Sequence, residues 1–299
     1  MTGQFREPID ITPRKVSFDW EGMDTHVYPG DPIGSHCVNS LHLLFPAGEN
    51  AFCRIFQEAL PYLEDDPKLK KDALAFIRQE AMHSRSHQGV VNHYEAMGVD
   101  TTQFTTAIDK LIRRGSGDLM YGFIPVKSAR MKRYWLAQRL AAVAVVEHFT
   151  CIMGMWALGD NNMEKAGMDP RMLDLLKWHC AEEVEHRNVA FDIYMHVSGN
   201  SHLSRWRSML MVMPGVYRLL RACGLEMMSK DPALAGQKIS FYRAWENSAA
   251  EGKLPSLKML FKSTRRWFTR SYDPQTEADT QVALDYFAVS PAVQAAASQ

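Results

Sequence analysis

From about residue 35 onward, apolar residues recur at the three- and four-residue spacing of an α-helix, with polar residues between them. Four of these stretches are long, and they predict helices at 35–63, 67–97, 127–158 and 170–199. The second and fourth begin with an acidic residue and proline, Asp66-Pro67 and Asp169-Pro170. The second stops at Gly98 and the fourth closes at Gly199. These are common helix boundaries. Four long helices in one chain predict an all-α, up-down bundle.

Prolines mark further boundaries along the chain. Pro46 removes one hydrogen bond from the first helix, and it therefore either kinks this helix or begins its second half. A short connecting helix is predicted at 102–114. Pro214-Gly215 is expected to divide the apolar segment 206–228 into two pieces. The shorter helices predicted after the bundle span 201–228, 232–251 and 255–270.

These patterns divide the chain into four parts. Residues 1–34 contain four prolines and little helical periodicity, so they predict an extended arm with a short strand around 15–20. Residues 35–200 are expected to form the bundle, and residues 201–275 to form additional helices packed on it. Residues 276–299 are expected to be a loose tail.

Composition excludes several classes of protein. Lys+Arg and Asp+Glu both number 34, so nothing suggests the basic footprint of a nucleic-acid-binding protein. The five cysteines are scattered without a CxxC pair, which disfavours a disulfide framework or a thiolate zinc site and fits a reducing compartment. No apolar run resembles a secretory signal or a transmembrane helix. We therefore expect a soluble, cytoplasmic protein.

Two ExxH motifs lie on separate predicted helices, Glu80-Ala-Met-His83 and Glu183-Val-Glu-His186. Residues three apart on a helix lie on the same face, so each carboxylate and imidazole can bind one ion together. A single ExxH tetrapeptide often occurs by chance. The motif therefore gains weight only from what the other two long helices contain.

Each of those two helices has a glutamate inside an apolar stretch, Glu49 in LLFPAGENAF and Glu147 in LAAVAVVEHF. A charged glutamate is rarely buried without a partner. Both helix faces around Glu147 are expected to be buried, and a cation best explains a carboxylate there. The chain order is thus Glu, ExxH, Glu, ExxH, one per helix, as in di-iron and di-manganese carboxylate bundles.

Other polar residues near these motifs have more than one interpretation. Glu182 and Glu185 are assigned to the surface or to contacts behind the ligands, and His87 and His148 either support the ligands or bind metal directly. Arg78, Arg85 and Arg187 are expected to pair with carboxylates behind the ligands. Asp192 either accepts a hydrogen bond from a ligating histidine or is a solvated helix residue.

These segments together resemble the ferritin-like di-metal superfamily. The stretch from LLFPAGENAF through FIRQEAMHSRSH and AVVEHF to HCAEEVEHRNVAFD resembles the bacterial family described as predicted metal-dependent hydrolases, over roughly residues 35–270. The resemblance implies a ferritin-like four-helix bundle with additional C-terminal helices. His179 precedes Glu183 by four residues, as in the arylamine N-oxygenases, and this resemblance implies a seventh ligand. Its alternative is a histidine that is hydrogen-bonded to a neighbouring carboxylate. The ligand set is then Glu49, Glu80, His83, Glu147, His179, Glu183 and His186.

Three functions are compatible with this set. We expect two iron ions, with manganese or zinc as alternatives, that activate O2 to oxidise a small apolar or aromatic substrate with an external electron donor. The first alternative is a metal-dependent hydrolase that uses metal-bound hydroxide, and the second is a non-enzymatic metal-binding or storage protein. No catalytic residue is predicted beyond the ligands. Segment 206–228 is expected to pack across the bundle or in a homodimer interface, although a lid or membrane-surface helix also fits.

Overall fold

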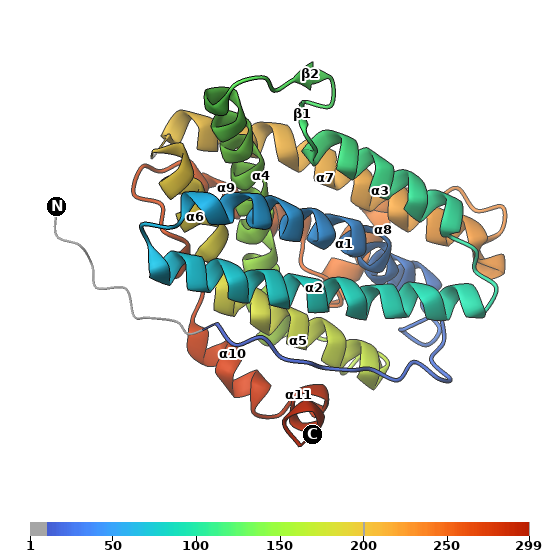
Figure 1. The fold of residues 1–299 in the computed structure, drawn as a ribbon. Helices are drawn as coiled ribbons and strands as arrows, with labels where there is room; N and C mark the ends of the chain where they lie inside the picture. The colour runs from blue at the N-terminus through green and yellow to red at the C-terminus, as the bar shows by residue number, and fades with distance from the viewer. Residues whose placement is uncertain (1–10, 200, 299) are drawn as a thin grey trace.

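The computed structural model describes residues 11–199 and 201–298, and in this part of the chain it is an all-α bundle (Figure 1). The first ten residues of the predicted arm lie outside the described residues. The helices are α1 (Pro32–Ala59), α2 (Pro67–Ala96), α3 (Thr102–Ser116), α4 (Ala129–Leu158), α5 (Pro170–His186), α6 (Val189–Ser198), α7 (His202–Lys230), α8 (Phe241–Ala250), α9 (Leu257–Trp267), α10 (Thr280–Phe287) and α11 (Pro291–Ala297). Two short strands, β1 (Leu119–Met120) and β2 (Ile124–Pro125), form an antiparallel hairpin between α3 and α4.

The predicted helix starts are confirmed by their caps. The carboxylate of Asp66 accepts a hydrogen bond from the backbone N–H of Leu69, and that of Asp169 accepts one from Arg171. Both bonds satisfy backbone donors that the first turn of a helix leaves free. The chain after α6 turns at Gly199, whose φ of 66° lies in the left-handed region that favours glycine.

Two predicted helix boundaries differ from the structure. The predicted helix 170–199 is interrupted at Arg187 and Asn188, so that α5 ends at His186 and α6 continues the chain. In contrast, α7 is continuous, with Pro214 inside it. Pro214 and Leu210 lie on the exposed side of α7, where water can bind the carbonyl that the proline leaves without a helical donor. Pro46 likewise lies inside a continuous α1, so it does not begin a new helix.

The arm and the tail also differ from the sequence-based prediction. Residues 15–20 form no strand, because no neighbouring strand is available to pair with them, and the arm follows α2 and α5 instead (Figure 1). The tail is not loose, since it contains α10 and α11. Asp174 of α5 accepts hydrogen bonds from Tyr286, Ser290 and Ala292, and these bonds attach both tail helices to the bundle.

Two apolar clusters flank a polar layer in the bundle. On α1 and α2 one cluster contains Leu43 and Val90, and the other contains Phe56 and Phe76. Each fully buried side chain of this size contributes about 1.5–3 kcal/mol to folding. Several such residues on each side offset the several kcal/mol that burial of a charged group costs. The polar layer between the clusters is where the sequence predicts metal ligands.

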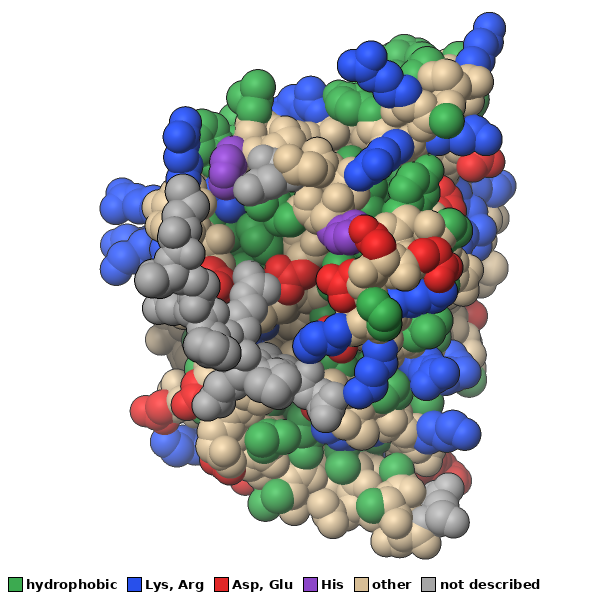
Figure 2. All heavy atoms as spheres, turned by 60° about the vertical axis from the view of Figure 1, so that its left-hand side comes forward, with side chains coloured by type: hydrophobic (Ala, Val, Ile, Leu, Met, Phe, Trp, Pro, Cys, Tyr) green, Lys and Arg blue, Asp and Glu red, His purple; other side chains and the backbone are tan. Residues whose placement is uncertain are grey.

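Helix α4 passes through the centre of the bundle. It is the one helix of the described residues that is long and apolar enough to cross a membrane. However, 67% of its most apolar window is buried inside the bundle, as in the core helix of a soluble protein. On the face drawn in Figure 2, acidic and basic side chains are interspersed, in keeping with a formal net charge of zero.

Candidate metal centre

The structure brings all seven predicted ligands together between α1, α2, α4 and α5. Each of the seven is at most 5% exposed. Helix geometry explains this, because the two ExxH pairs lie on the inner faces of α2 and α5 and each projects both side chains inward. The seven residues are Glu49, Glu80, His83, Glu147, His179, Glu183 and His186.

The seven residues form overlapping groups whose ligand atoms lie within 4.8 Å of one another. One group contains Glu80, Glu147, Glu183 and His186. Two other groups bring Glu49 and Glu80 to His83, and Glu183 to His83 and His179. One more group joins Glu49 and His179 to His87. Glu80 and Glu183, the glutamates of the two ExxH motifs, thus belong both to the group with Glu147 and to a group with His83. This arrangement fits two adjacent ions with two shared carboxylates.

Several buried atoms of this group have no hydrogen-bond partner among the described residues. They are both carboxylate oxygens of Glu49 and of Glu147, one oxygen of Glu80, and Nδ1 of His83. An unsatisfied buried polar group costs about 1–3 kcal/mol, and more if it is charged. Metal ions bound between these atoms would remove that cost. The residues present therefore fit a metal centre.

His186 shows why a proton alone does not satisfy this layer. Its Nε2 lies 3.0 Å from Glu147 Oε2, 3.2 Å from Glu183 Oε2 and 3.5 Å from Glu80 Oε1. One N–H can donate well to only one of these three oxygens. A cation at the same point can bind several oxygens and the nitrogen at once.

Burial and mutual repulsion control the charges in the metal-free centre. Burial, followed by repulsion from Glu183, raises the pKa of Glu147 to about 8. The pKa values of Glu49 and Glu80 are raised well above the usual range, first by burial and then by neighbouring carboxylates. Burial alone would lower the pKa of His186, but the charges of Glu183 and Glu147 outweigh it and raise the pKa to about 10. Protons therefore occupy the centre when metal does not, and metal must displace them.

Each of the three histidines is held from behind through its other ring nitrogen. Nε2 of His83 lies 3.0 Å from Glu182, and Nδ1 of His186 lies 3.0 Å from the carbonyl oxygen of Gln79. Nδ1 of His179 lies 2.6 Å from Nε2 of His87. Partners of this kind fix the ring orientation and the tautomer of ligating histidines. The free nitrogens then face the carboxylates, as metal binding requires.

Arg14 of the arm connects two of these supporting groups. Its guanidinium lies 3.0 Å from Glu182 Oε1 and 3.0 Å from Glu185 Oε1. Glu185 in turn accepts a hydrogen bond of 2.6 Å from Gln79. Glu182 and Glu185 are both buried, so their assignment to the surface is wrong and their assignment behind the ligands is confirmed. Arg14 could not be predicted from the sequence, because the arm has no helical register that would place it.

The three arginines that the sequence analysis selected do not pair with the carboxylates behind the ligands. Arg78 and Arg85 are exposed, and Arg187 binds the carbonyl of Val184 and the hydroxyl of Thr280. The expected pairing with carboxylates behind the ligands is therefore wrong for all three. Arg78 and Arg85 leave the outer face of α2, away from the carboxylates between the helices. Arg187 is buried just after α5, but its guanidinium is directed to Val184 and Thr280 instead.

Two further histidines and one aspartate have distinct positions. His87 contacts His179 and, at 2.7 Å, Nδ1 of His42, so it supports a ligand. His148 points away from the centre and contacts Tyr272 and Ser263. It therefore does not have either of its predicted roles. Asp192 lies half-buried on α6, beyond the end of α5.

A cavity of about 390 Å³ leads to the centre. Glu49, Glu80, Glu147, His179 and Glu183 line its inner end. The walls come from α1, α4 and α7 and are mainly apolar, with Leu44, Phe52, Val143, Val146 and Val212 among them. Its volume lies in the usual range of ~300–1,000 Å³ for small-molecule sites. Segment 206–228 thus packs across the bundle as predicted, and it also forms one wall of the cavity.

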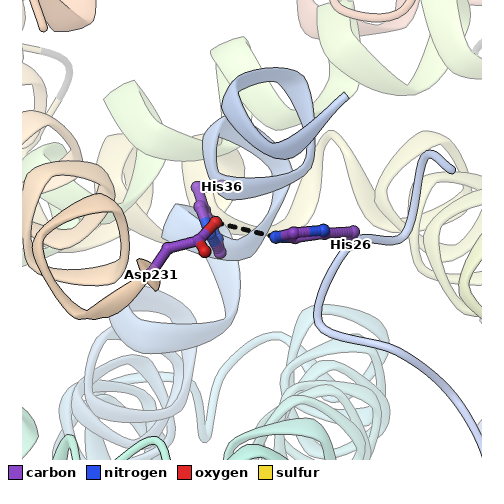
Figure 3. A group of neighbouring side chains, drawn as sticks. All are labelled: His26, His36 and Asp231. Carbon is purple, nitrogen blue, oxygen red and sulfur yellow. Dashed lines mark hydrogen bonds and ion pairs between the residues drawn. The ribbon is translucent and has the colours of Figure 1, made fainter. Parts of the chain in front are cut away.

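A second group of metal-ligand types lies elsewhere and differs in chemistry. His26 of the arm and His36 of α1 both point at Asp231, at the end of α7 (Figure 3). Their Nε2 atoms lie 2.7 and 2.8 Å from the same carboxylate oxygen. Asn39 donates to Nδ1 of His36, so Nε2 carries the proton and donates to Asp231. This cluster is satisfied without an ion and attaches the arm to the bundle.

The comparison with known families agrees with a metal centre at these residues. A model of the family described as "Predicted metal-dependent hydrolase" matches residues 12–278, which include Arg14 and all seven candidate ligands. The chain belongs to this family. Neither the curated proteins nor the solved structures gave a match. The predicted metal-dependent hydrolases are thus the relatives that bear on function here, and their description supports metal binding by an enzyme.

Proposed function

We propose that the chain binds two metal ions in the polar layer and uses them as an enzyme. In this proposal Glu49, His83 and His179 would hold one ion, Glu147 and His186 would hold the other, and Glu80 and Glu183 would contribute to both. The observation that carries the proposal is the set of buried carboxylate oxygens without hydrogen-bond partners among the described residues. A structural role for these glutamates would leave the cost of burial uncompensated.

The donor set indicates which metals fit. It consists of carboxylates and imidazoles, and the grouped ligand atoms include no thiolate. Such sets suit iron, manganese and zinc, whereas thiolate-rich sets select zinc or clusters. We propose iron as the resident metal, in a ferritin-like di-iron arrangement.

Oxidation of an apolar substrate is the reaction that the cavity favours. Among the described residues that line the cavity near Glu147, Thr150 is the one polar residue that is not a candidate ligand. Its hydroxyl already donates to Glu183 at 2.5 Å. No separate acid is therefore placed there to protonate a leaving group. Bound iron would supply the reduction of O2, with electrons from an external donor. The chain's own residues exclude water and position the substrate beside Glu49 and Glu147.

Hydrolysis is the second candidate, and the description of the family favours it over oxidation. Metal ions in this layer would activate a water molecule. The carboxylate of Glu147 lines the inner end of the cavity and would be placed to accept its proton. A non-enzymatic storage role explains the paired ligands but not the long apolar cavity, so we place it third.

The deciding experiment is the metal content of protein purified from iron-supplemented cells, followed by anaerobic reduction and exposure to O2. About two irons per chain and a transient visible absorption band would support oxidation. Two zinc or manganese ions, no reaction with O2 and turnover of ester or amide substrates would support hydrolysis instead. Protein that binds less than one ion per chain under both conditions would refute the metal centre itself.

A further inference from the structure

The cavity has an identifiable mouth at the end remote from the metal centre. Among its lining residues, Gly115, Tyr121, Arg207 and Met211 are exposed, and they belong to α3, the hairpin turn and α7. The candidate ligands at the other end are buried. Gln138 of α4 lies at the level of Arg207, nine residues before Glu147. At a rise of ~1.5 Å per residue, the two ends are ~13 Å apart.

The mouth carries a guanidinium that lacks an acidic partner. Arg207 donates to Gln138 and, at 2.9 Å, to the hydroxyl of Tyr134, both of which are neutral. Among the described residues no carboxylate lies within ion-pair distance of it. Arg139, which also lines the cavity, differs because it is paired with Glu58. Arg207 is therefore available to a ligand, and Arg139 is not.

A second hollow of about 410 Å³ adjoins the mouth and shares Gln138 and Arg207 with the cavity. It is lined by Arg130 and Arg133 of α4 as well. Neither has an acidic partner within ion-pair distance in the described part of the chain, so three guanidinium groups without such partners line one hollow. Lys and Arg side chains also gather at the upper end of Figure 2, the end at which the hairpin lies in Figure 1.

The apolar cavity and the guanidinium groups at its mouth favour a ligand with an apolar chain at one end and a negative charge at the other. Apolar walls stabilise a hydrocarbon chain by burial. Guanidinium groups bind carboxylates and phosphates through charge-assisted hydrogen bonds. We propose that the site binds an anionic amphiphile, with its chain in the cavity and its carboxylate or phosphate head at Arg207. Arg130 and Arg133 attract that head, and the far end of the chain lies beside the metal centre. This inference names the substrate class of the proposed enzyme, but its binding step does not depend on the reaction.

The test is the dissociation constant of four ten-carbon probes, measured calorimetrically on the protein as purified and after treatment with a chelator. The probes are decanoate, decyl phosphate, decanol and decyltrimethylammonium. We expect at least one anionic probe to bind about tenfold or more tightly than decanol, the effect of one charge-assisted hydrogen bond. Preference between decanoate and decyl phosphate then identifies the head group.

Two variants and a matched control test where the head group and the hydrocarbon chain bind. Arg207→Gln is expected to remove most of the preference for the anion over decanol, and Arg218→Gln, exposed on the same helix but outside both hollows, to leave it unchanged. Ala142→Phe, midway along the cavity wall, is expected to weaken all ten-carbon probes while metal content and helicity persist. Equal binding of decanol and both anions, tightest binding of the cation, or an unchanged preference in Arg207→Gln would overturn the proposal. Because binding is also measured without metal, loss of the metal proposal would leave this result interpretable.

Discussion

Glu147 shows what a single carboxylate requires inside an apolar helix. It is 2% exposed, and neither of its oxygens has a hydrogen-bond partner among the described residues. Its neighbours along α4, including Val143 and Val145, are apolar and buried. A glutamate in this place therefore depends on a cation or a proton, and the two compete for it.

Replacement of Glu147 by glutamine keeps the shape of the side chain and removes its charge. We expect the variant to fold with unchanged helicity and to bind fewer than two ions per chain, because one ion loses its only unshared carboxylate. Circular dichroism and metal analysis measure both quantities. Two ions retained at unchanged affinity would exclude Glu147 from the centre.

Gln79 is a residue whose importance only the structure reveals. It accepts from His186 and donates to Glu185, so Gln79→Leu leaves the ring nitrogen of His186 without this partner and leaves Glu185 to Arg14. Loss of such a supporting group typically costs ~10–100-fold in metal affinity. We expect a loss in that range, measured by competition with a chelator.

Gln88→Leu is the matched control for Gln79→Leu. Gln88 lies exposed on the same helix and bonds only to Asn92 in the described part of the chain. We expect it to leave affinity unchanged. Equal affinity in both variants would show that Gln79 does not orient His186.

At the scale of elements, the sequence predicted those features that depend on residues close together in the chain. Caps and apolar periodicity located the long helices, and the two ExxH spacings placed their side chains on inner faces. The break at Arg187 and the helices of the tail could not be predicted, because they depend on tertiary packing. The arm contributes Arg14 through contacts 168 and 171 residues away in the chain, which no local pattern encodes.

Pro214 offers a test of the continuous α7. A proline inside a helix usually costs ~3 kcal/mol or more, although an exposed position reduces this cost. Pro214→Ala restores the missing N–H, and we expect the free energy of unfolding to rise by about 1–2 kcal/mol. Urea denaturation measures this change. A decrease would mean that the proline stabilises α7 through packing or by restricting the unfolded chain.

At the scale of the whole molecule, stability and metal binding are coupled through protons. In the metal-free fold the pKa of Glu147 is raised to about 8 and that of His186 to about 10. At a pH between the ordinary pKa of each group and its raised value, the group is protonated in the folded chain and deprotonated in the unfolded chain. Stability that these two groups contribute is present at low pH and is lost as pH rises through the raised values.

We therefore expect the metal-free protein to melt at a lower temperature at pH 8 than at pH 6.5. The metal-loaded protein is expected to change in the opposite direction or remain constant, because proton release favours metal binding. Thermal melts with and without a chelator test this difference. Parallel pH profiles for the two forms would contradict the coupling.

The two proposed metal positions are not chemically equivalent. By that proposal two imidazoles and Glu49 would face one position, whereas one imidazole and Glu147 would face the other. Imidazole suits iron and zinc, while carboxylate-rich surroundings also suit manganese. A mixed supply of metals would therefore sort between the two positions, and a heterodinuclear centre would follow from the uneven distribution of three histidines over two ions.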